Sequence, residues 1–328
     1  MSEPLITLEH VQRTFDVKGQ TITAVNDVNL EIPAGEVLCL VGESGCGKTT
    51  TGKMIAGLLP VSYGRILFRG QDIAALAPAE RKSYRLGVQM VHQDPYASLN
   101  PVQTIADILA APLQHHRFTR GEAETRKRMR ELLEIVDLTP PDDYLDKYPH
   151  QLSGGQRQRV SVARALTVNP AFIVADEAVS MVDVSIRISL LKMFTRLKDE
   201  MGVGVLLITH DLALAKYFAW EGRIGVMYLG RLVEIGPARQ VVGHPQHPYT
   251  QVLLSAIPEA DPDVTRAKPR IALRSTDVPS LLRLPTGCTF HPRCPAFAGE
   301  VCAREVPALK RAGWGSDVAC HLAQAHEP

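Results

Sequence analysis

Residues 42–49 constrain the fold of this chain more than any other segment. They read GESGCGKT and satisfy the pattern G-x-x-x-x-G-K-[ST]. An apolar run at residues 37–41 precedes them, and residues 48–58 carry apolar side chains at helical spacing. A glycine-rich loop between a buried strand and a helix is typical of an α/β fold. The segment therefore predicts a loop that holds nucleotide phosphates.

The chemistry explains why these residue types are needed at this spacing. Glycines let backbone N–H groups curl around phosphates, and the following helix directs its positive end at them. Lys48 is predicted to reach the β- and γ-phosphates, and the Thr49 hydroxyl is predicted to bind Mg²⁺. Cys46 lies where any residue type would serve. The predicted nucleotide-binding residues of the loop are Gly42, Ser44, Gly45, Gly47, Lys48, Thr49 and Thr50.

A second segment carries the expected acidic residues. Residues 172–177 read FIVADE, an apolar strand that ends in two carboxylates. Alone, such a strand end is more often a solvated tip. Downstream of a phosphate-binding loop it predicts Asp176 beside Mg²⁺ and Glu177 facing the γ-phosphate, where its carboxylate can act as general base toward water.

Pattern and composition favour one large α/β unit. Strand-like runs alternate with helical patterns, which implies βαβ units and a mostly parallel sheet. Thr119 and Glu122 predict a capping box at the start of one helix. The 328 residues include 45% hydrophobic residues, enough for a proper core. The net charge of +1, from 36 basic and 35 acidic side chains, argues against a nucleic-acid partner.

Location is predicted from what the sequence lacks. No stretch approaches 18 uninterrupted apolar residues, and the first residues, MSEP, show no export signal. We therefore expect a cytosolic chain that reaches a membrane only through a partner. In a reducing compartment the six cysteines are better candidates for metal ligands than for disulfides.

Residues 152–156 connect the two phosphate-handling segments to a family. They read LSGGQ and precede a helix, so on physical grounds they form another potential anion site. Together with the phosphate loop they resemble the signature motif of ATP-binding cassette (ABC) ATPases. The resemblance implies an α/β cassette with a mostly parallel core sheet, an antiparallel β subdomain and a helical subdomain. It also implies hydrolysis of ATP to ADP and phosphate.

The family resemblance assigns further roles. Gln93 resembles the Q-loop glutamine, which contacts Mg²⁺ or water, and His210 resembles the switch histidine that holds the γ-phosphate. With Glu177 they form the expected catalytic set. Phe15 is the aromatic residue expected to stack on adenine. Residues 180–183 occupy the D-loop position.

Two departures from the family pattern lie near this site. Ala178 and Val179 stand where the family commonly has Pro and Thr, and Met181 stands where it usually has Ala. Neither removes a charge or a hydrogen-bonding group from the reaction. They put the contacts between two cassettes in question, but we still expect the chain to hydrolyse ATP.

The same resemblance implies an assembly. In this family the signature of one cassette faces the phosphate loop of another, so Ser153 and Gly155 are expected to serve the nucleotide of a partner. We therefore expect a second ABC ATPase subunit, identical or different, and two transmembrane permease subunits. An external solute-binding protein would act indirectly, and the chain would lie peripherally on the cytoplasmic face of the cell membrane.

Two segments narrow the subfamily. Residues 93–101, QDPYASLNP, resemble the Q-loop extension of oligopeptide/dipeptide importer ATPases. Residues 244–250, HPQHPYT, resemble the segment after their cassette, where a turn built by prolines is expected around His244 and His247. The expected cargo is an oligopeptide or dipeptide. Related cassettes import oligosaccharides, nickel or glutathione, and these remain alternatives.

The C-terminal part differs in composition. From about Pro258 the chain is rich in Pro and Arg, so we predict a cassette over residues 1–257 and a Cys-rich extension over residues 258–328. Its four cysteines fit zinc or an iron–sulfur cluster in ligand type. Importers with a similar tail imply a [4Fe–4S] cluster; zinc and plain packed thiols remain open. The predicted ligands are Cys288, Cys294, Cys302 and Cys320.

A rival function comes from a different class, a soluble ABC ATPase in iron–sulfur assembly or nucleic-acid repair. Repair-type cassettes carry a long coiled-coil insertion, which this sequence lacks, and a cluster-assembly ATPase would lack the cysteine tail. The expected function is therefore the energy-coupling ATPase of an importer.

Overall fold

The structure is a computed structural model that describes residues 4–180, 182–257, 263, 266 and 271–323. Met181 of the D-loop segment lies outside the described residues, as do residues 258–262 beside the predicted domain boundary. Within the described chain, no helix is both long enough and apolar enough to cross a bilayer.

The central layer is a mixed sheet of strand order β11-β12-β10-β9-β3-β8-β7-β6. The five strands from β9 to β6 are parallel, and the other three are antiparallel. Strands β3, β7 and β8 are wholly buried, as expected for parallel strands covered on both faces. The mostly parallel core sheet predicted from the sequence is confirmed. Its strands are β3 Val37–Val41, β6 Val88–Val91, β7 Phe172–Asp176, β8 Gly204–Thr209, β9 Arg223–Tyr228, β10 Arg231–Pro237, β11 Lys310–Arg311 and β12 Asp317–Val318.

A second, antiparallel sheet of order β2-β1-β4-β5 packs against one face of this layer. Alternation along β3 decides which side chain meets which core. Leu38 and Leu40 join the apolar cluster shared with the second sheet, while Cys39 joins the cluster beneath the helices. The strands are β1 Ile6–Val17, β2 Gln20–Ile32, β4 Tyr63–Phe68 and β5 Gln71–Asp72.

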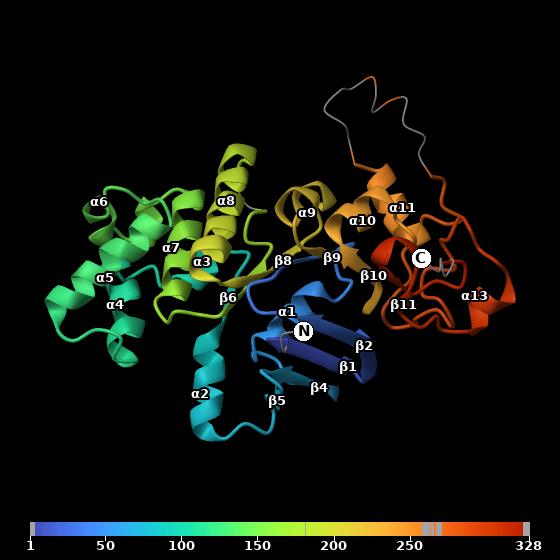
Figure 1. Cartoon of the computed structure of the whole chain (residues 1–328), viewed down its shortest axis with the longest axis horizontal. Helices are drawn as coiled ribbons and strands as arrows, with labels where there is room; N and C mark the ends of the chain where they lie inside the picture. Colours follow the sequence, from blue (N-terminus) through green and yellow to red (C-terminus); the bar gives the residue numbers. More distant parts are fainter. Residues whose placement is uncertain (1–3, 181, 258–262, 264–265, 267–270, 324–328) are drawn as a thin grey trace.

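Helices α4 to α7 form a subdomain at one end of the molecule, opposite the C-terminal region (Figure 1). Their apolar stripes meet each other: Met129, Leu132 and Leu133 of α5 are buried, as the helical spacing predicts. The predicted capping box is wrong, because α5 begins after Gly121 and Thr119 instead hydrogen-bonds Thr125. These elements are α3 Pro95–Ser98, α4 Ile105–His115, α5 Glu122–Ile135, α6 Asp142–Leu145, η1 Pro149–Gln151 and α7 Gly154–Leu166.

The C-terminal region continues the core sheet. Strand β12 pairs with β10, with Val318 opposite Glu234 and Asp317 opposite Ile235. The cysteine-rich extension is thus hydrogen-bonded to the cassette along a strand edge. The remaining elements are α1 Lys48–Ile55, α2 Pro78–Gly87, α8 Val184–Met201, α9 Leu212–Phe218, α10 Ala238–Gly243, α11 Pro248–Ser255, α13 Glu300–Arg304 and η2 Gly313–Gly315.

Candidate functional site

The glycine-rich loop joins β3 to α1, and two of its glycines are required by their surroundings. Gly42 has a φ of +152°, and a Cβ there would lie 2.2 Å from the Met227 carbonyl oxygen. Gly47 has a φ of +104°, and its Cβ would lie 2.3 Å from the Ala24 carbonyl oxygen. The loop is therefore pressed between β2 and β9, with backbone that only glycine accepts. Ser44 and Gly45 are exposed at its tip.

Lys48 lies inside this loop. Its Nζ donates hydrogen bonds to the carbonyl oxygens of Gly42 (2.8 Å) and Glu43 (2.9 Å), and the side chain is buried. The ammonium group is thereby fixed at the start of α1, whose first N–H groups carry partial positive charge. Cation and helix end together make a site for an anion such as a phosphate group. Thr50, on the first turn of α1, is half-buried beside them.

The predicted magnesium residues meet at the next strand. Thr49 Oγ1 donates a 2.8 Å hydrogen bond to Asp176 Oδ1 at the end of β7. Burial raises the pKa of Asp176; the Thr49 hydrogen bond opposes this shift, and the neighbouring charge of Glu177 adds to it. A carboxylate and a hydroxyl in contact are oxygen donors of the kind that Mg²⁺ binds.

Glu177 is held by residues from both neighbouring strands. Its Oε2 accepts a 2.9 Å hydrogen bond from Gln93 Nε2, which follows β6, and its Oε1 lies 3.2 Å from His210 Nδ1, which follows β8. The backbone of Glu177 has a φ of +45°, and its N–H donates to the Ile208 carbonyl. The structure thus brings the three predicted catalytic side chains together at the carboxyl ends of parallel strands.

The two signature residues lie elsewhere in the chain. Ser153 caps α7: its Oγ accepts from the Gln156 N–H (3.3 Å), and its own N–H donates to Gln156 Oε1 (2.9 Å). Gly155 packs against α8 so tightly that a Cβ would lie 2.5 Å from Ile186 Cγ2. In Figure 1 helix α7 lies apart from α1, so a single chain does not join signature and loop.

Phe15 lies on β1 opposite Ile22 of β2 and is half-buried. The Arg13 guanidinium lies 4.7 Å from its ring centroid. Ile22 is two residues before Ala24, whose carbonyl borders Gly47. The ring therefore belongs to the strand pair that flanks the loop, which is compatible with the predicted contact with adenine.

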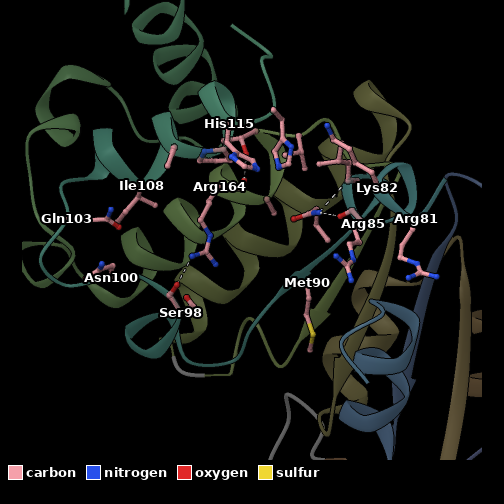
Figure 2. A pocket seen from close by; sticks show the side chains of 18 of the residues that line it. Arg81, Lys82, Arg85, Met90, Ser98, Asn100, Gln103, Ile108, His115 and Arg164 are labelled. Atoms are coloured by element: carbon pink, nitrogen blue, oxygen red, sulfur yellow. Dashed lines mark hydrogen bonds between the residues drawn. The ribbon is translucent and has the colours of Figure 1, made fainter. Parts of the chain in front are cut away.

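A cleft of about 1040 Å³ opens between α2, α4 and α7 (Figure 2). Figure 2 shows the basic side chains Arg81, Lys82 and Arg85 gathered along one wall. Arg164 of α7 lines the cleft and donates a 2.5 Å hydrogen bond to the Ser98 carbonyl. Because Ser98 and Asn100 belong to the segment that begins at Gln93, the cleft is continuous in sequence with the catalytic group.

The four cysteines of the extension border one small cavity, together with His247 and Phe290. Burial raises the pKa of the Cys288 thiol to about 11 and also raises the pKa of Cys294 and Cys320. These shifts favour the protonated thiols, but four thiols around one cavity are of the ligand type that a four-thiolate site requires. Their positions do not fit such a site, because among the described residues no three Cys, His, Asp or Glu side chains are grouped closely enough to hold a metal ion.

The sequence did not reveal that Arg293, Tyr249 and His247, which lie outside the phosphate loop, help to hold it in place. The Glu43 carboxylate is paired with the Arg293 guanidinium of the extension, 250 positions away, and the Glu43 N–H donates to Tyr249 Oη. His247, expected in a proline turn, is fully buried and caps α11 by accepting from the Tyr249 N–H. The quoted segment HPYT contains this tyrosine, but no local pattern links residue 293 to residue 43.

Comparison with known proteins places these features in a family. The model described as "ABC transporter" matches residues 25–180, and the model for the oligopeptide/dipeptide transporter C-terminal region matches residues 233–302. The oligopeptide transport ATP-binding protein AppF of Bacillus subtilis (strain 168) is 40% identical over 98% of this chain and 98% of its own length. YkfD of the same strain is 42% identical over 97% of this chain and 95% of its own.

A solved structure has the same fold. The ATP-binding cassette MJ0796, described as dimeric, in a post-hydrolysis state and bound to ADP and Pi, matches with a TM-score of 0.64 and 30% identity. The match covers 71% of this chain and 99% of that chain.

Proposed function

The chain belongs to the ATP-binding proteins of the oligopeptide/dipeptide ABC transporter family, and from this we infer that it hydrolyses ATP to power a peptide importer. One observation carries the proposal that the residues above do this chemistry. Glu177 is held between Gln93 and His210 beside the Thr49–Asp176 pair, at the mouth of the loop that contains Lys48.

The reaction follows from this geometry. The loop and Lys48 bind the β- and γ-phosphates of ATP. Thr49, Asp176 and Gln93 would hold Mg²⁺, which would supply positive charge to offset the negative charge of the phosphates. Glu177 accepts a proton from water as the water oxygen forms its bond to the γ-phosphorus, and the bond to the ADP oxygen breaks. Gln93 orients the Glu177 carboxylate, and His210 donates a hydrogen bond toward the transferring phosphate.

The variant Glu177→Gln tests the role of Glu177 as general base. It keeps the size and polarity of the side chain and removes the base, so we expect hydrolysis to fall by about 10²-fold or more while MgATP binding persists. The exposed Glu200 of α8 provides the control variant Glu200→Gln, which should leave both unchanged. Full hydrolysis by Glu177→Gln would assign the base to another residue.

The chain works as an ABC ATPase dimer in a transporter complex. We propose that Ser153 and Gly155 complete the site of the partner cassette, since they lie away from the loop of their own chain. The N-terminus of α7 then directs its N–H groups at the partner's γ-phosphate. The partner cassette is either a second copy of this chain or a related chain.

We propose that the cleft between α2, α4 and α7, with its basic wall, receives a cytoplasmic segment of one membrane subunit. A segment seated there contacts Ser98 and Asn100, and so acts on Gln93 through the intervening chain. This would hold the chain peripherally on the cytoplasmic face of the cell membrane. Purification from native membranes should bring down two permease subunits and the second ATPase, and loss of the permeases from a variant with Arg81 and Arg85 both changed to Glu would support the assignment.

The cargo is proposed to be an oligopeptide or dipeptide, as the name of AppF and the matched C-terminal region suggest. Import of labelled peptides by the assembled complex tests this, with oligosaccharide, nickel and glutathione as the competing cargoes. A soluble ATPase of iron–sulfur assembly has no support from either match.

For the extension we propose a [4Fe–4S] cluster on Cys288, Cys294, Cys302 and Cys320, with a structural role. The proposal is supported by four thiols around one cavity, and requires them to move closer together. Protein purified without oxygen should be brown and contain iron and sulfide. Colourless protein with one zinc ion per chain would overturn it in favour of zinc, and metal-free protein in favour of packed thiols.

A further inference from the structure

Glu43, the first variable residue of the phosphate loop, has three polar groups and each is held. Its carbonyl oxygen accepts from Lys48 Nζ at 2.9 Å. Its N–H donates to Tyr249 Oη at 2.9 Å. Both carboxylate oxygens accept from Arg293, at 3.0 and 2.9 Å. One end of this residue therefore positions the ammonium group of the loop, and the other end is tied to the C-terminal part of the chain.

Arg293 is held rigidly. Its residue is only 6% exposed, and it also lies 3.3 Å from Tyr228 Oη. The rings of Tyr228, Tyr249 and Phe290 pack against one another with centroids 4.6 to 5.2 Å apart, beneath the guanidinium. A cation fixed in this way loses little side-chain entropy when it pairs with a carboxylate. The pair is therefore a preorganised contact rather than a mobile surface ion pair.

Charge explains why the loop needs such a partner. A nucleoside triphosphate brings several negative charges to the loop, and an unpaired carboxylate at position 43 would repel them. Arg293 offsets the charge of that carboxylate; its own side chain is 7% exposed and that of Glu43 is 29% exposed, so solvent screens the pair only in part. Tyr249 meanwhile fixes the backbone through which Glu43 holds Lys48.

From this geometry we propose that Arg293 and Tyr249 are positioning residues for the phosphate loop, so that the cysteine-rich extension sets the affinity of the chain for ATP. Arg293 precedes Cys294, and its N–H donates to the Phe290 carbonyl in the turn that carries Cys288. The fold of the cysteine region is therefore transmitted to the nucleotide site directly through Arg293, and indirectly through Tyr249 of α11, whose ring packs against Phe290.

The test uses four full-length variants: Arg293→Gln, Glu43→Gln, the double variant, and Arg274→Gln as matched control. Arg274 belongs to the same region, but its side chain contacts the Phe297 ring and the His291 carbonyl. The measurements are the dissociation constant for MgATP, and KM and kcat for ATP hydrolysis. Thermal unfolding checks that each variant is folded.

We expect Arg293→Gln to raise the dissociation constant and KM for ATP by roughly tenfold or more, because it leaves Glu43 unpaired, with a smaller effect on kcat. Glu43→Gln in the same chain should restore KM to within about threefold of the parent, since the repelling charge is gone. Arg274→Gln should match the parent. A purely structural role for Arg293 would instead leave the double variant at least as impaired as Arg293→Gln, and that result, or a parental KM in Arg293→Gln, would overturn the proposal.

The variant Tyr249→Phe provides a second test of the proposal, independent of the Arg293–Glu43 ion pair. It keeps the ring in the aromatic packing and removes only the acceptor of the Glu43 N–H. We expect KM for ATP to rise a few-fold, which Glu43→Gln should not rescue because the lost contact is with the backbone. An unchanged KM would remove Tyr249 from the proposal, and rescue by Glu43→Gln would contradict its stated mode of action.

Discussion

At the scale of single residues, Asp176 shows how the surroundings tune one carboxylate. Burial raises its pKa, the Thr49 hydrogen bond opposes the shift, and Glu177 adds to it. A raised pKa means that Asp176 retains its proton at a higher pH than an ordinary aspartate, whose pKa is 3.8. Magnesium must displace that proton in order to bind.

A pH dependence follows from this shift. We expect the gain in ATP affinity that Mg²⁺ provides to shrink as pH falls, starting above the ordinary aspartate range, because protonated Asp176 is a poor ligand. Asp176→Asn should show little gain at any pH. The measurement is a titration of both proteins with ATP, with and without Mg²⁺, at several pH values. Because protonation of ATP itself affects both proteins equally, the comparison removes its contribution. Equal pH profiles for the two proteins would contradict the assignment of Asp176.

Most of the site is predictable at this scale because its motifs are local. Lys48 begins the helix after the phosphate loop, and Asp176 and Glu177 lie at the end of a strand, so their sequence neighbours determine where they point. Arg293 is different: its partner lies 250 positions away, and the contact depends on how the extension docks. No spacing rule records such a contact.

At the scale of elements, the pairing of α7 with α8 explains one glycine in a second way. The resemblance assigns Gly155 to a partner's nucleotide, whereas the structure shows that its missing Cβ also lets Ile186 approach. The sequence predicts a helix after residues 152–156, but it does not report how close that helix lies to another. The close approach of Ile186 to Gly155 is therefore known only from the structure.

The variant Gly155→Ala separates the two roles. Its Cβ would lie 2.5 Å from Ile186 Cγ2, so we expect a loss of about 1–3 kcal/mol in the free energy of unfolding, measured without nucleotide. Adding Ile186→Ala removes the overlapping methyl group and should recover part of the loss. If Gly155→Ala unfolds like the parent yet loses hydrolysis, the glycine serves the nucleotide alone.

At the scale of the whole molecule, the separation of α7 from α1 makes the catalytic site a product of assembly. A mixture of two inactive variants can show this. Lys48→Ala damages the loop and Ser153→Arg blocks the signature, so a mixed homodimer contains one intact loop facing one intact signature.

We expect hydrolysis to reappear in single-turnover assays when the two variants are mixed, and to stay absent in each alone. A cis arrangement would leave the mixture inactive, because neither chain has both halves. An inactive mixture in which the two variants do not form dimers with each other would instead place the second cassette on a different chain. A mixture of Lys48→Ala with Lys48→Arg serves as the control, since it supplies no intact loop.

The pairing of β12 with β10 also has a consequence for the solubility of the chain. Strand β10 would otherwise end its side of the core sheet as an open edge with unpaired N–H and C=O groups, and such edges recruit strands from other molecules. The short strand β12 occupies this edge, and both residues of β11 beyond it are exposed, beginning with Lys310. A chain cut after residue 257 should therefore aggregate on concentration, even though every motif of its nucleotide site is retained.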